Sequence, residues 1–214
     1  MTPAFQSVQE ISALHEAAHC VIKWRLTCDC YQKDNSAGFD VIVVRTDAAI
    51  AAGPYIDSQG RQHNCTAISE MSAFQNAGML DDDVPDFAAN STRKKMGHDI
   101  IVALAGPVSE AKVRGCSADS LFDRPHAGFQ DYQQAAKLIL FMNLKPEDCL
   151  PKFNELRRQT EEWIADRQVW NTICALSGAL LARGDWRLTG EQALPVMTEA
   201  WNAATTSGSS AIPS

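Results

Sequence analysis

ISALHEAAHCVI, residues 11–22, is the stretch of this sequence on which the fold prediction depends. Its apolar residues recur at the three- and four-residue spacing of one helix face, and they are Ile11, Leu14, Ala18, Val21 and Ile22. Ser7, with Glu10 three residues later, has the spacing of a capping box, which marks a helix N-terminus. We therefore predict a helix that begins at Ser7 and ends before TCDCYQKDNSAG, the polar stretch over residues 27–38.

Two histidines lie four residues apart in this stretch, and a glutamate directly follows the first. Residues four apart on a helix share a face, so His15 and His19 can each direct one imidazole nitrogen at a single ion. Glu16 lies to one side, where it can reach a water molecule bound to that ion. Zinc suits such a site because it accepts imidazole and carboxylate ligands and keeps a position open for water. The pattern predicts a zinc site with Glu16 as the general base of a hydrolase.

An ordinary helix can also carry these side chains as satisfied polar residues. The flanking residues are apolar on both sides, however, and burying two imidazoles and a carboxylate is costly unless something pairs them. A zinc ion of this type needs a third protein ligand. Chemistry alone does not choose among the candidates, which are His63, His98, His126, Glu110, Asp119, Asp123 and Asp131.

The rest of the chain predicts a mainly α fold with a small β element, an α+β class. FDVIVVRT, residues 39–46, is short, apolar and β-branched and predicts a strand, and a second strand is expected around Tyr55 and Ile56. Helical patterns follow over residues 91–115, 129–142 and 147–183, and a last helix is expected after Thr189. Gly106 and Pro107 predict a kink or a break within the first of these helices.

We expect a single domain over residues 1–203, with the metal site in residues 1–145 and C-terminal helices in residues 146–203. The small, polar tail at residues 204–214 is expected to be disordered.

Composition limits the classes of partner. The 214 residues carry a formal net charge of −7, which argues against nucleic acid as the main partner. No window approaches the roughly 18 apolar residues of a membrane span, and the N-terminus lacks the pattern of a signal peptide. The seven cysteines are an odd number, which without an export signal predicts reduced thiols in the cytoplasm.

Two further stretches contain candidate metal ligands. Cys28 and Cys30, with His63 and Cys65, form a candidate second zinc site, although Cys-x-Cys matches the usual zinc spacing poorly. DDDVPD, residues 81–86, is expected to be a solvated acidic loop, with a cation site as the alternative.

Four segments together resemble the peptidase domain of the FtsH-type AAA proteases. LHEAAHCVI (residues 14–22) looks like the family's HEAGHA segment, and DIIVALAGPVSEAKVRG (99–115) is similar to its second conserved helix. GFQDYQQAAKLI (128–139) resembles the segment in which an aspartate precedes Gln-Gln-Ala-Thr, and TICALSGALLARGDWRLTGEQ (172–192) resembles the C-terminal helices. The resemblance implies a helical, zincin-like peptidase domain. The chain has no phosphate-binding Gly-x-x-x-x-Gly-Lys-Ser/Thr loop, so the family's ATPase is not part of the resemblance.

The resemblance also implies roles for individual residues. The family's third zinc ligand corresponds to Asp131, which the residues alone would interpret as an aspartate interacting with a helix dipole. Glu110 aligns with the glutamate of the second helix, and we expect it to orient a ligand histidine by accepting its free N–H. His126 is the alternative third ligand. The chain departs from the family at Ala18, where glycine is usual, and at AGP (residues 105–107), and residues 57–95 look like an insertion.

Two functions are therefore expected. The first is a zinc metallopeptidase that cleaves unfolded or flexible protein segments, alone, as a homo-oligomer or with a separate ATPase. In this function the strand at residues 39–46 is expected to present an edge to the substrate peptide. The second is a non-catalytic peptidase-like module that keeps the metal for stability and binds a partner through its tryptophans. Core packing is the ordinary explanation for these side chains, which are Trp163, Trp170, Trp186 and Trp201.

Overall fold

The computed structural model describes residues 7–31, 37–71, 86–122 and 128–208. It confirms a mainly helical fold with a small antiparallel sheet. The chain forms two compact units: unit 1 consists of residues 1–72 and 165–214, and unit 2 of residues 73–164. A single functional domain over residues 1–203 stays a prediction. Among the described residues, no helix is long and apolar enough to cross a membrane.

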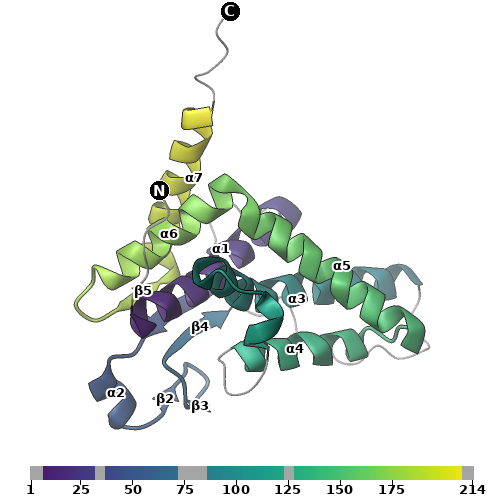
Figure 1. The fold of residues 1–214 in the computed structure, drawn as a ribbon, viewed down its shortest axis with the longest axis horizontal. Coiled ribbons are helices and arrows are strands. Elements are labelled where there is room, and N and C mark those ends of the chain that lie inside the picture. Colours follow the sequence, from purple (N-terminus) through teal and green to yellow (C-terminus); the bar gives the residue numbers. More distant parts are fainter. Residues whose placement is uncertain (1–6, 32–36, 72–85, 123–127, 209–214) are drawn as a thin grey trace, which may run out of the picture. The chain divides into compact units, whose positions relative to one another are not determined.

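Unit 1 is built on a three-stranded antiparallel sheet in the order β4–β1–β5 (Figure 1). Its strands are β1 (Phe39–Val44), β4 (Ala67–Met71) and β5 (Arg187–Thr189), and a separate hairpin joins β2 (Tyr55–Ile56) to β3 (Gln62–His63). The helices are α1 (Val8–Tyr31), α2 (Asp47–Ala51), α6 (Arg167–Leu181) and α7 (Gly190–Gly208). The strands predicted at residues 39–46 and around Tyr55 are thus confirmed.

β1 is the central strand of the sheet. Ile42 lies opposite Ser69 of β4 on one side and opposite Leu188 of β5 on the other. The expectation that this strand offers an edge to a substrate is therefore wrong. The physical reason is its composition, because five of the six residues in FDVIVV are buried and such a strand is stabilised by neighbours on both sides.

α1 begins as the sequence predicts and ends later. The Ser7 N–H donates to Oε2 of Glu10 at 2.8 Å, and the Glu10 N–H donates to Oγ of Ser7 at 3.1 Å, which confirms the capping box. The helix was expected to end before Thr27 but continues to Tyr31. Thr27 is buried and its hydroxyl donates to the Lys23 carbonyl, so this polar residue is satisfied within the helix.

The core of unit 1 lies between α1, α6 and the sheet. α1 packs against β1, β4 and α6 (Figure 1). The largest fully buried side chains are aliphatic, and in unit 1 they are Leu14, Ile22, Leu26, Ile42, Ile173, Leu176 and Leu180. This packing fixes the orientation of α1, which carries the two histidines.

Unit 2 is helical in its described part. It contains α3 (Asp86–Arg114), a 3₁₀ turn η1 (Ala118–Leu121), α4 (Gly128–Phe141) and α5 (Pro146–Ala165), whose last residue belongs to unit 1. α3 starts before the predicted Ser91 and ends at Arg114, and the following Gly115 adopts φ +65° as expected of a helix-terminating glycine. The helix continues through Pro107 without a break. Every residue from Ile100 to Ala111 is buried, so this part of the helix is held by its packing.

The C-terminal helices follow the predicted pattern with different ends. The stretch predicted to be helical over residues 147–183 forms two helices, α5 and α6, and the second ends at Leu181. α7 includes Pro195 and continues to Gly208, so residues 204–208 of the tail expected to be disordered are helical. Residues 81–85 of the acidic stretch lie outside the described part of the chain. The four tryptophans are buried or half-buried, which supports core packing rather than a partner surface.

Candidate functional site

The middle of α1 is enclosed by the rest of the protein. Every residue from Ala13 to Trp24 is buried except Glu16, which is partly exposed. A carboxylate is the group that most requires solvent or a charged partner, so its position at the one open point of this segment is physically reasonable. The helix thus places two buried imidazoles beside a carboxylate that can reach solvent.

The two imidazoles lie one helical turn apart. His15 is 5% and His19 is 6% exposed, and their ring centroids are 4.8 Å apart with the ring planes at 75°. One nitrogen from each ring at this separation matches the donor spacing that a helix offers to a single metal ion. The geometry of α1 therefore fits two of the three protein ligands of a catalytic zinc site.

Glu16 exerts its charge on two nearby thiols of unit 1. Burial raises the pKa of the Cys20 thiol, and the negative charge of Glu16 raises it further. Burial likewise raises the pKa of Cys65, with a second contribution from Glu16, while Arg45 lowers it. Glu16 is therefore close to Cys65, which lies two residues before β4. The charge of the Glu16 carboxylate thus acts on the segment directly before β4.

β4 is an outer strand of the sheet and lies against α1. Ser12 of α1 and Thr66, just before β4, have their hydroxyl oxygens 3.4 Å apart. No strand is predicted from the sequence at residues 67–71, so β4 was missed. The β-branched residues Thr66 and Ile68 were the local signal for it.

Asp131, the predicted third ligand, belongs to unit 2. It is partly exposed and lies in the first turn of α4. Gly128 allows α4 to begin there, because a Cβ atom on it would lie 2.8 Å from the Leu121 carbonyl oxygen and 2.9 Å from Cβ of Pro107. The next residue, Tyr132, stacks on Phe122 with ring centroids 4.9 Å apart. α4 is thereby fixed to its own unit at the turn that carries the carboxylate.

Two other candidate acids of unit 2, Glu110 and Asp119, have structural partners. Glu110 is buried, and its Oε1 accepts a hydrogen bond from Arg114 Nε at 2.7 Å. Its predicted contact with a ligand histidine stays a prediction. Asp119 forms an ion pair with Arg157. His126 and Asp123 lie outside the described residues.

The candidate second zinc site is not assembled. His63 Nε2 lies 2.9 Å from Oδ2 of Asp57, and all seven cysteines are free thiols. Among the described residues, Cys28, Cys30, His63 and Cys65 do not form a group that could hold an ion. His63 instead contacts Asp57 within the β2–β3 hairpin.

Comparison with known proteins gives no family assignment. No family model matches the chain, and no curated protein matches it. The function of this chain is therefore inferred from its own residues.

Proposed function

We propose that this chain is a zinc-dependent metallopeptidase of the FtsH peptidase type, which hydrolyses peptide bonds in unfolded or flexible protein segments. The observation that carries this proposal is the arrangement on α1: two buried imidazoles one turn apart, with Glu16 as the partly exposed residue between them. Burying two imidazoles beside a carboxylate is costly unless something pairs them, and a shared metal ion would do so.

The proposed zinc ligands are His15, His19 and Asp131. In this proposal one nitrogen of each imidazole and one carboxylate oxygen of Asp131, the ligand that the family resemblance implies, bind the same ion. Two imidazoles and one carboxylate form a donor set of catalytic zinc sites, which leave a fourth position open. When bound, zinc lowers the pKa of a coordinated water molecule towards ~7 and polarises the substrate carbonyl.

Glu16 is the proposed general base. Its carboxylate takes a proton from the attacking water while the water oxygen bonds to the carbonyl carbon. The same proton then passes to the nitrogen of the leaving amine as the C–N bond breaks. Buried neighbours hold α1 in place, while the partial exposure of Glu16 leaves room for water and substrate.

The substrate is proposed to bind as an extended strand along the outer edge of β4. This strand takes the role that was expected of β1, because β4 has one neighbour in the sheet and lies beside α1. A peptide that pairs by main-chain hydrogen bonds has to be extended, so unfolded segments are the favoured substrates. A folded substrate requires a separate unfolding ATPase.

The test compares Glu16→Gln with the wild type and with Glu199→Gln, a control on the exposed face of α7. We expect all three proteins to hold one zinc per chain by elemental analysis. Glu16→Gln should lose about 10²–10⁴-fold in the rate of casein cleavage, and the control should lose nothing. Full cleavage by Glu16→Gln, or a wild type that binds no zinc, overturns the proposal.

A further inference from the structure

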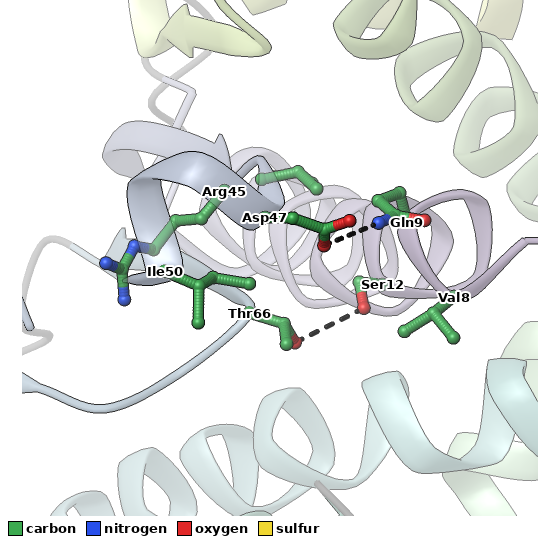
Figure 2. Close-up of a pocket in the computed structure, with 8 residues that line it drawn as sticks. Val8, Gln9, Ser12, Arg45, Asp47, Ile50 and Thr66 are labelled. Carbon is green, nitrogen blue, oxygen red and sulfur yellow. Dashed lines mark hydrogen bonds between the residues drawn. The ribbon is translucent and has the colours of Figure 1, made fainter. Parts of the chain in front are cut away.

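Unit 1 contains a pocket beside the first two turns of α1 (Figure 2). Its volume is about 290 Å³, and its walls come from the start of α1, the end of β1, α2 and the residue before β4. Small-molecule sites usually occupy about 300–1,000 Å³. The pocket is therefore close to the lower limit for a whole ligand and better matched to one side chain.

Hydrogen bonds within the protein occupy the polar groups that line this pocket. Gln9 Nε2 donates to Oδ1 of Asp47 at 3.3 Å, and the hydroxyl oxygens of Ser12 and Thr66 are 3.4 Å apart. Figure 2 shows these two interactions connecting α1 to its neighbours across the pocket.

The cation in the pocket wall is also occupied. Arg45 is buried, and its guanidinium donates to the Cys65 carbonyl at 3.0 Å and to the carbonyls of Ala49 and Gly53. In Figure 2 the guanidinium points away from Asp47. A charged occupant would therefore have to replace existing contacts.

Two of the apolar lining residues, Val8 and Ile50, are in contrast exposed, while Val44 is buried. Val8 is 64% exposed and Ile50 is 38% exposed, and Val44 completes the apolar wall. Large apolar side chains with this exposure gain free energy when another apolar group covers them. The lining thus favours an aliphatic or aromatic occupant.

Two elements connect the pocket to the proposed catalytic site, namely α1 and the segment that leads into β4. Ser12 and Val8 precede Glu16 by four and eight residues on α1, distances of about 6 and 12 Å along the helix. Thr66 directly precedes β4, the strand proposed to bind the peptide. An extended peptide advances about 3.3 Å per residue, so these distances correspond to about two to four residues.

We propose that this pocket holds an apolar side chain of the substrate polypeptide, about two to four residues from the bond that is cleaved. Val8 and Ile50 are its specificity-determining residues. The proposal rests on the proposed peptidase function and adds to it a preference for one kind of side chain at one position.

The experiment uses the full chain with zinc and a set of fluorogenic peptides that carry leucine, serine or lysine at each position in turn. The variants are Val8→Ser, Ile50→Ser and the double variant. Ile56→Ser is the matched control, because Ile56 is 54% exposed on β2 and does not line the pocket. All replaced side chains are exposed, and circular dichroism verifies that the variants fold.

We expect the wild type to prefer leucine over serine at one position about two to four residues from the cleaved bond. The double variant should reduce this preference about five- to tenfold through KM, the effect of losing about 50 Å² of apolar contact, with preferences elsewhere unchanged. The same loss should appear in the dissociation constant of a labelled leucine peptide, measured by fluorescence anisotropy in the Glu16→Gln background.

The other outcomes distinguish a failure of the pocket proposal from a failure of the peptidase proposal. If the wild type cleaves and the double variant keeps its leucine preference, the pocket proposal fails and the peptidase proposal stands. If lysine is preferred and Asp47→Asn removes that preference, the occupant is basic and the proposal of an apolar side chain is wrong. If the zinc-loaded wild type cleaves no peptide and no casein, the peptidase proposal fails and the pocket proposal fails with it.

Discussion

Nε2 of His63 lies 2.9 Å from Oδ2 of Asp57, a carboxylate that the β2–β3 hairpin encloses almost completely. The same carboxylate accepts hydrogen bonds from Arg61 Nε at 2.6 Å and from the backbone N–H groups of Gln59 and Arg61. Burial alone would raise the pKa of Asp57, but these hydrogen bonds outweigh it and hold the pKa well below its usual range. The hairpin is therefore organised around one charged side chain.

Asp57→Asn should destabilise the protein in a pH-dependent way. The folded state depresses the pKa of this carboxyl, so its stabilisation is present above the unfolded-state pKa of about 3.9 and is lost as the pH falls below that value. The variant should unfold several degrees below the wild type at pH 7, and the gap should narrow towards pH 3. Thermal unfolding at pH 7, 5 and 3 measures this. A gap that stays constant with pH would show that the charge is not the cause.

Zinc should stabilise the folded protein through the histidines of α1. Zinc at 100 times its dissociation constant adds about 2.7 kcal/mol to the free energy of unfolding. His15→Ala and His19→Ala should abolish the zinc-dependent rise in Tm, and Asp131→Asn should reduce it. Differential scanning fluorimetry with and without a chelator measures the effect.

Two histidine variants act as controls for the third ligand. His98→Ala and His126→Ala should retain the zinc-dependent rise in full. If His126→Ala reduces it and Asp131→Asn does not, His126 is the third ligand and the assignment of Asp131 is wrong.

Gly190→Ala should be strongly destabilising. A Cβ atom on Gly190, the first residue of α7, would lie 2.2 Å from the carbonyl oxygen of Phe39, so the backbone of β1 or α7 has to move. Overpacking of this kind costs about 1–3 kcal/mol. Urea denaturation measures the loss.

Gly178→Ala is the matched control for this variant. Gly178 is exposed in α6, and its added methyl group would meet nothing within 4 Å. Removing a glycine from a helix interior should raise the stability by about 0.5–1 kcal/mol. Equal losses in both variants would contradict a steric cause at Gly190.

Ser7→Ala should weaken the start of α1. The Ser7 hydroxyl accepts the Glu10 N–H, and the loss of such a cap costs about 1 kcal/mol. Glu10→Gln should cost less, because a glutamine side chain can also accept the Ser7 N–H. Chemical denaturation compares the two. A larger loss in Glu10→Gln would show that charge at the helix terminus matters more than the reciprocal hydrogen bonds.

Local sequence patterns predicted those parts of the site that depend on one helix. The capping box at Ser7 and the four-residue spacing of His15 and His19 are properties of neighbouring residues, and both are present in α1. The end of α1 was missed because it depends on tertiary contacts. Burial of Leu26 and Thr27 and the Arg25–Asp29 ion pair extend the helix through polar residues that a local rule assigns to a loop.

Features that depend on distant residues could not be predicted in this way. β1 was recognised as a strand, but its central place in the sheet is set by Leu188, which is far away in the sequence. β4 was missed because its stability comes from pairing with β1 rather than from its own pattern. For the same reason spacing alone did not select Asp131, which was assigned from the family resemblance.

The sheet of unit 1 takes β1 and β4 from the early part of the chain and β5 from residues 187–189. During synthesis, the strand that completes the sheet therefore leaves the ribosome after all of unit 2 has emerged. Unit 2 draws its residues from one uninterrupted stretch, so the nascent chain can fold it first. A chain stalled before α6 would present the apolar faces of α1 and β1 to chaperones, and translation has to pass residue 189 before the helix with the two histidines acquires its native surroundings.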